Sequence, residues 1–191
     1  MLRWIIRALA ILVFVVAGLV VLAFAEILVP VGPDHTSSMA NTIPGCKGRV
    51  LAEGVTYRIR DPRENEVVVV HAAVTDQGKV VPDKDARDRE LVLRVAAVPG
   101  DTIEGRAGTV FVNDEKLDSI TTKPFPKRTV PNGQYYLLGD NRSAAIDSRT
   151  FGTVLRNAIF AKAFAVYWPL RDITFSLTPG SGAPPGPIDC G

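Results

Sequence analysis

The N-terminal end of the chain carries its longest run of apolar residues. Arg3 and Arg7 come first, and residues 8–25 then contain no polar side chain. About 20 apolar residues in a helix span the hydrocarbon core of a bilayer, and flanking arginines favour the cytoplasmic side. The pattern predicts a cytoplasmic N-terminus over residues 1–7 and a transmembrane helix over residues 8–26.

A cleaved secretory signal is the alternative for this segment, because "AFAEI" places small residues beside the apolar run. The apolar core of such signals is usually shorter, at about 7 to 15 residues. A retained single-pass anchor is therefore favoured. In both cases the rest of the chain is expected at the outer face of the cytoplasmic membrane.

From about residue 48 the apolar residues follow the pattern of β-strands. "EVVVVHA" and "LVLRVAAV" are β-branched runs, "GTVFVNDEKL" leads into a turn at Asn113-Asp114, and "GQYYLLGD" is a further strand candidate. The alanine-rich "TVLRNAIFAKAFAVYW" is expected to be a strand, with a helix as the alternative. The sequence predicts a mainly antiparallel β domain, a barrel or coiled sheet, over residues 27–176, followed by a flexible Gly/Pro-rich tail over residues 177–191.

Composition narrows the classes of function. A formal net charge of +2 with 22% charged residues gives no reason to expect a nucleic-acid partner. His35 and His71 lie far apart, and neither Cys46 nor Cys190 has the neighbours of a zinc site, so no metal or other cofactor is expected. Outside the cytoplasm the two cysteines could form a disulfide, and two free thiols are an equally open interpretation.

Three short stretches differ from ordinary strand or turn sequence. They are "TSSMANTI" (residues 36–43), "VPGDTI" (residues 98–103) and "GDNRSAAIDSR" (residues 139–149). Each taken alone has a structural explanation: a membrane-proximal linker, a turn after a strand, or a salt-bridged surface loop. Their order behind one anchor helix indicates that they belong to one site.

That combination resembles the type I signal peptidases, membrane-bound serine endopeptidases that cut signal peptides from exported proteins. "SSMANTI" is similar to the family's serine-methionine-x-proline-threonine-leucine box, "LRVAAVPGDTIE" to its lysine-arginine box, and "GDNRSAAIDSR" to its closing box. An unrelated anchored β-domain would need this order to be coincidental. The resemblance implies an all-β catalytic domain outside the membrane, a Ser/Lys dyad, and precursor proteins and the lipid bilayer as partners.

The resemblance also implies roles for individual residues. Ser38 falls on the family's nucleophile, and Thr36 falls on a hydroxyl that helps to stabilise the oxyanion. The residues that match positions bracing the family's active site are Arg94, Asp101, Asp140, Arg142, Asp147 and Arg149.

The chain departs from the family at the proton acceptor. The family's lysine stands six residues before the proline of its box, and in this chain Leu93 stands six residues before Pro99. A serine hydroxyl needs a neighbour that accepts its proton, and leucine has no lone pair. A serine that orients the lysine in the family is replaced by Ala145. The paired changes predict a proton-acceptor pocket converted to hydrophobic packing.

Two interpretations of function stay open. The first, favoured by the family resemblance, is an active signal peptidase with an unusual base, for which His35, His71 and Asp147 are candidates. Its substrate would add as an extended strand to an exposed sheet edge. The second is a catalytically weak or inactive homologue, a pseudoenzyme, that binds exported peptides or partners an active peptidase.

Overall fold

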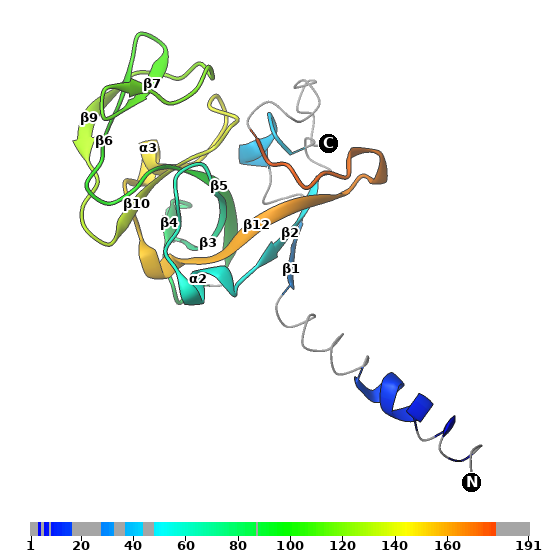
Figure 1. The fold of residues 1–191 in the computed structure, drawn as a ribbon. Coiled ribbons are helices and arrows are strands. Elements are labelled where there is room, and N and C mark those ends of the chain that lie inside the picture. Colours follow the sequence, from blue (N-terminus) through cyan, green and yellow to red (C-terminus); the bar gives the residue numbers. More distant parts are fainter. Residues whose placement is uncertain are drawn as a thin grey trace.

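The computed structural model describes residues 4, 6–7, 9–16, 28–32, 37–43, 48–86 and 88–178. From residue 28 onward these residues form two antiparallel sheets, and the described N-terminal residues form a helix that projects away from them (Figure 1). The prediction of a mainly antiparallel β domain is confirmed.

The strands are β1 (Leu28–Val31), β2 (Arg49–Glu53), β3 (Val67–Val74), β4 (Val80–Pro82), β5 (Arg89–Ala97), β6 (Thr102–Arg106), β7 (Thr109–Val112), β8 (Glu115–Lys116), β9 (Phe125–Thr129), β10 (Gln134–Leu138), β11 (Val154–Leu155) and β12 (Ile159–Trp168). Short helices connect them: η2 (Ser37–Met39), α2 (Thr56–Ile59), α3 (Ser148–Phe151), η4 (Arg156–Ala158) and η5 (Leu170–Asp172).

The larger sheet is open. Its order is β1-β2-β12-β3-β5-β10-β11, with β4 beside β3, and the described strands do not close it into a barrel. Register shifts in β12 accompany its pairing with β2 and β3, and such bulges increase the local twist of a sheet. Of the two forms expected from the sequence, the barrel is therefore wrong for the described strands.

The burial of strand β5 on both of its faces explains why its sequence is a nearly continuous run of apolar residues. Leu91, Leu93 and Val95 point into one hydrophobic cluster, whereas Val92 points into a second cluster on the opposite face. A strand buried on both faces shows no alternation of apolar and polar residues. The central position of β5 carries one of its charged residues, Arg94, into the interior.

The alanine-rich segment forms strand β12, as expected. It pairs with β2 along one edge and with β3 along the other. Ala161 and Ala163 pack in the same cluster as Val50 and Val69. Pairing on both edges satisfies backbone groups that a helix would have satisfied internally, so tertiary context outweighs the helical propensity of alanine.

The smaller sheet has the order β8-β7-β6-β9 and follows β5 directly in the chain. The predicted turn at Asn113-Asp114 is confirmed: it joins β7 to β8, and the two residues have φ angles of 51° and 66°. Two consecutive positive φ angles are typical of a type I′ hairpin turn.

The predicted transmembrane helix lies mostly outside the described residues. Residues 9–16 are helical, and the side chains of Leu9, Ile11 and Phe14 are exposed. Among the residues that the structure describes, no helix is both long and apolar enough to cross a bilayer. Membrane anchoring remains a prediction, as does the flexible tail, of which only Leu177 and Thr178 are described.

Candidate active site

The turn that carries Ser38 is anchored by buried apolar side chains. The backbone N–H groups of Thr42 and Ile43 both donate to the Met39 carbonyl at 2.8 Å. Met39 and Ile43 have no exposed surface and pack in the cluster that also contains Val92 of β5. Ser38 precedes the buried Met39 and is itself half-buried.

The loop that follows β10 is hydrogen-bonded to this turn. The Asn141 N–H donates to the Ser38 carbonyl at 2.9 Å, and the Asn141 side-chain amide donates to the Ser37 carbonyl at 3.2 Å. In return, the Asn41 amide donates to the Asp140 carbonyl at 2.9 Å. The first and third stretches singled out in the sequence therefore lie side by side.

A buried ion pair connects β5 to the same loop. Arg94 donates to Asp140 through Nε, at 2.9 Å from Oδ1, and through Nη2, at 2.6 Å from Oδ2. Arg94 is 4% exposed and Asp140 is 0% exposed. The hydroxyl of Thr42 also donates to Asp140, so the pair holds the Ser38 turn. A two-pronged contact of this kind fixes orientation as well as distance.

A second ion pair shapes the closing loop from within. Arg149 donates to both oxygens of Asp147, at 2.8 and 2.7 Å, and the Gly139 N–H donates to Asp147 at 3.1 Å. Asp147 also caps α3 by accepting from the Arg149 N–H at 3.0 Å. Arg142 contacts the Gly139 carbonyl at 2.9 Å and Asp118 at 2.5 Å, which ties the loop to the smaller-sheet region.

Asp101 is placed apart from these contacts. Its carboxylate accepts from the Val98 N–H at 2.8 Å and from the Asn113 side-chain amide at 2.7 Å. It therefore holds the turn between β5 and β6 against the β7–β8 turn. Its hydrogen bonds stabilise the junction of the two sheets and do not reach the Ser38 turn.

Leu93 lies where the sequence comparison expects a lysine, and it is fully buried. It packs in the cluster with Val68, Val95 and Leu137. Leu138 pairs with Arg94, so the next residue along, Gly139, comes level with Leu93.

Gly139 has no room for a side chain. A Cβ atom at Gly139 would lie 2.3 Å from the Ala145 Cβ, 2.5 Å from the Ser38 carbonyl oxygen and 3.3 Å from the Ser38 Cβ. Ser38 and Ala145 are thus both neighbours of Gly139, beside the strand that carries Leu93.

Within the described residues, no atom forms a hydrogen bond with the Ser38 hydroxyl. The His71 ring stacks on Phe160 with centroids 3.7 Å apart. His71 pairs with Glu90, four residues along β5 from Arg94, which is roughly 13 Å along a strand. The oxygens of Asp147 accept from Arg149 and Gly139. The remaining candidate base, His35, and the predicted oxyanion residue, Thr36, lie outside the described residues.

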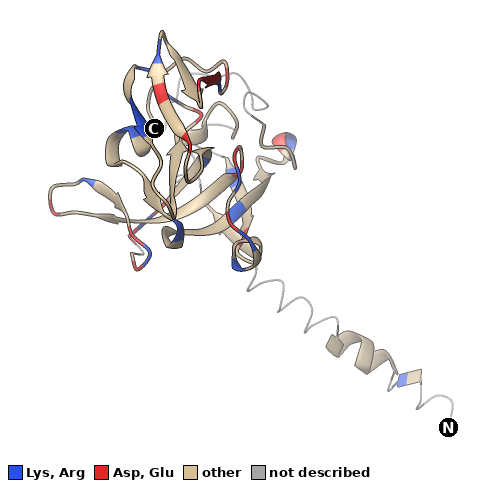
Figure 2. Cartoon of the chain, turned by 60° about the vertical axis from the view of Figure 1, so that its left-hand side comes forward, with Lys and Arg blue, Asp and Glu red and all other residues tan. Residues whose placement is uncertain are grey.

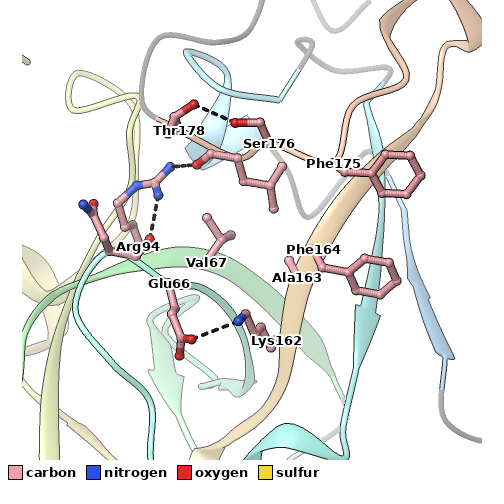
Figure 3. A pocket seen from close by; sticks show the side chains of 11 residues that line it. Glu66, Val67, Arg94, Lys162, Ala163, Phe164, Phe175, Ser176 and Thr178 are labelled. Carbon is pink, nitrogen blue, oxygen red and sulfur yellow. Dashed lines mark hydrogen bonds and ion pairs between the residues drawn. The ribbon is translucent and has the colours of Figure 1, made fainter.

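A pocket of about 400 Å³ opens beside Arg94 (Figure 3). Its lysine, Lys162, points to Glu66 and forms an ion pair with it at 2.9 Å. Burial by itself would raise the pKa of Glu66, but hydrogen bonds from Arg60, the Arg63 N–H and Lys162 outweigh it and lower that pKa to about 2. The ammonium of Lys162 is therefore held by a permanent carboxylate.

The sequence analysis missed three residues that hold the site together. Thr42, Asn141 and Gly139 all lie inside the quoted motifs, yet their partners are about a hundred residues away in the chain. Among the described residues, no group of three His, Cys, Asp or Glu side chains could hold a metal ion.

Known proteins with similar sequences identify the arrangement. A family model described as "Signal peptidase, peptidase S26" matches residues 2–168. A probable signal peptidase I-2 of Synechocystis is 35% identical over 140 residues, which make up 71% of this chain and 61% of that protein. Signal peptidase IB of Staphylococcus aureus strain MRSA252 is 27% identical over 154 residues, which make up 69% of this chain and 74% of that protein.

A solved signal peptidase I from Enterococcus faecalis V583 is 24% identical to this chain, and the match covers 53% of this chain and 95% of that one. Its TM-score of 0.41 is too low to support a conclusion about the structure of this chain. The chain spans about three fifths of the length of the Synechocystis relative. The family match covers the Ser38 turn, β5 and the closing loop together, and the chain belongs to the type I signal peptidases of peptidase family S26.

Proposed function

We propose that this chain binds the signal peptides of precursor proteins beside Ser38, at the outer face of the cytoplasmic membrane. The observation that carries this proposal is the Ser38 turn itself, tied by Asn141 and by the Arg94–Asp140 pair into one rigid unit in a member of the signal peptidase family. Residues 8–26 would anchor the chain in the bilayer, with residues 1–7 in the cytoplasm.

Strand β5 offers the edge that such a peptide needs. β10 pairs with β5 only at Arg94, Val95 and Ala97. Leu91 and Val92 pair with β3 on their other edge, and no described strand pairs with them on the β10 side. An extended peptide that adds to this edge would have its backbone fixed by hydrogen bonds and would be directed toward the Ser38 turn.

We further propose that the native chain cleaves its ligand weakly or not at all. Deprotonation of a serine by a general base contributes about 10² to 10⁴ to rate. By the family resemblance, Leu93 stands at the position of an amine and Ala145 at that of a hydroxyl, and Ala145 and Ser38 both lie against Gly139. The chain would then act by holding exported peptides or by partnering an active peptidase.

An active endopeptidase is the second candidate. The family assignment and the intact Ser38 turn favour it, and His35 would supply the base because it stands three residues before Ser38. In this form the chain would remove signal peptides itself, through an acyl-enzyme intermediate on Ser38.

A cleavage assay separates the two candidates. Full chain in detergent is incubated with a precursor that has small side chains at the cleavage site. We expect the native chain to match the Ser38→Ala variant, whereas the Leu93→Lys/Ala145→Ser variant cleaves at least 10²-fold faster. A matched Leu93→Met/Ala145→Ser control supplies bulk without a base and is expected to show no gain.

Two outcomes contradict the proposal. Cleavage by the native chain that Ser38→Ala abolishes would establish the active endopeptidase. Absence of measurable precursor binding to the native chain, by fluorescence anisotropy with a labelled signal peptide, would remove the binding function.

A further inference from the structure

The segment of residues 175–178 crosses the larger sheet at a gap between two of its strands (Figure 3). β12 pairs with β3 only over residues 159–162, because β3 begins at Val67. Further along β12, the Val166 N–H donates to the Thr174 carbonyl at 2.8 Å and the Thr174 N–H donates to the Val166 carbonyl at 3.1 Å. The chain thus turns back along β12, next to the part of β12 that does not pair with β3.

Leu177 makes two contacts there. Its carbonyl accepts from Arg94 Nη2 at 2.6 Å. Its side chain packs against the cluster that contains Met39 and Ile43, the two anchors of the Ser38 turn. The pocket beside it stays open, with Lys162 in its wall, so the segment covers the gap without filling it.

Arg94 connects this segment to the Ser38 turn. The same Nη2 that donates to Leu177 also donates to Asp140 Oδ2 at 2.6 Å, and Asp140 accepts the Thr42 hydroxyl. Both charged side chains are almost completely shielded from water. Coulomb attraction weakens several-fold when water raises the effective dielectric constant, so loss of the covering segment would loosen the pair.

We propose that residues 175–178 position the Ser38 turn, with Leu177 as a positioning residue that acts through Arg94. The segment lies outside all three motifs and is brought to the site only by the return of the chain along β12. The inference rests on the proposed function for the importance of Ser38, but the chain of contacts and its test need neither cleavage nor peptide binding.

Two truncations of the full chain test it by amide hydrogen exchange in detergent. A chain that ends at Ser176 lacks Leu177, and a matched chain that ends at Thr178 retains it. The Asn141 and Thr42 amides, which donate to the Ser38 and Met39 carbonyls, report on the turn. We expect about tenfold faster exchange at both in the shorter chain alone, with amides of the β6–β7 ladder unchanged as an internal reference.

A point substitution separates the carbonyl from the side chain. Leu177→Ala keeps the carbonyl that Arg94 contacts, and Leu177→Met keeps the bulk as well; we expect exchange at Asn141 within about threefold of the native rate in both. Equal exchange at Asn141 in the two truncations would overturn the proposal. So would equal acceleration in the reference ladder, or a Leu177→Ala variant that behaves like the shorter truncation. Failure of precursor binding would contradict the proposed function alone.

Discussion

The resemblance to the signal peptidases assigns Leu93 to the position of the family's lysine, and the surroundings of Leu93 bear on what an amine would meet there. The side chain is fully buried among aliphatic residues such as Val68 and Val95. An amine in such surroundings would be desolvated, which lowers the pKa of a lysine toward the range useful for a base. The surroundings of Leu93 therefore have the apolar character that a catalytic lysine would require.

At this position we expect Leu93→Lys to lower the free energy of unfolding by about 2 to 5 kcal/mol, because a polar amine replaces packed methyl groups. Adding Ala145→Ser should recover part of the loss, since the new hydroxyl can accept a hydrogen bond from the amine. Urea unfolding at pH 8 measures the free energy of unfolding of the single and of the double variant. Leu93→Met is the volume-matched control and should cost under about 1.5 kcal/mol; equal losses for Lys and Met would show that the pocket is not closed.

The Ser38 turn and the loop after β10 are the two elements whose contact forms the site. They meet at Gly139, where no side chain fits between Ser38 and Ala145. They are held together by backbone hydrogen bonds and by Asp140, which receives Arg94 from β5 and Thr42 from the turn. Three elements from distant parts of the chain thus share one buried carboxylate.

For the contact of these two elements we expect Gly139→Ala to lower the free energy of unfolding by about 1 to 3 kcal/mol, because the new methyl group must displace backbone. Gly54→Ala is the matched control, since its Cβ would meet only the Phe160 carbonyl at 3.4 Å. Thermal unfolding by circular dichroism compares the two. Similar midpoints would mean that the turn and the loop can move apart.

For the shared carboxylate we expect Asp140→Ala to cost about 3 to 5 kcal/mol, because it leaves the Arg94 guanidinium buried without its counter-ion. The double variant Arg94→Met/Asp140→Leu should cost clearly less than Asp140→Ala, since it removes both charges together. Chemical denaturation of the native chain and of the two variants gives the comparison. A double variant at least as unstable as the single one would contradict a desolvation penalty at this site.

Across the whole molecule, charges of both signs are interspersed over the β domain (Figure 2). Glu66, an acidic residue in the wall of the pocket, accepts from Tyr57 and Arg60 at the α2 end and from Lys162 of β12. One carboxylate therefore ties α2 and β12 to the start of β3.

This connection predicts how stability depends on pH. The folded pKa of Glu66 is about 2, below the ordinary value of 4.5, so its contribution is fully present above about pH 4.5 and is lost as the pH falls toward 2. After allowance for solvent screening, we expect the Glu66 carboxylate to contribute about 1 kcal/mol to the free energy of unfolding. Unfolding free energies between pH 6 and pH 3 should fall less steeply in Glu66→Gln than in the native chain. The exposed Glu115→Gln variant is the control, and equal slopes in all three proteins would contradict the assignment.

Much of this protein was determined by local sequence alone. The β-branched runs specified strands, Asn113-Asp114 specified a hairpin turn, and the three motifs specified the family. The departures from the family motif at Leu93 and Ala145 were also readable, because they are identified by residue type and by spacing. Such features depend on side-chain chemistry within a few residues, and folding does not alter them.

Other features were decided only by tertiary structure. The open sheet, the place of β12 between β2 and β3, and the passage of residues 175–178 over Arg94 all depend on strand pairings between distant segments. The hydrogen bond from Thr42 to Asp140 joins residues 98 positions apart. No periodicity in the sequence encodes such partners, because a hydrogen bond or a packed methyl group is fixed by distance in space, which the chain acquires only when its sheets form.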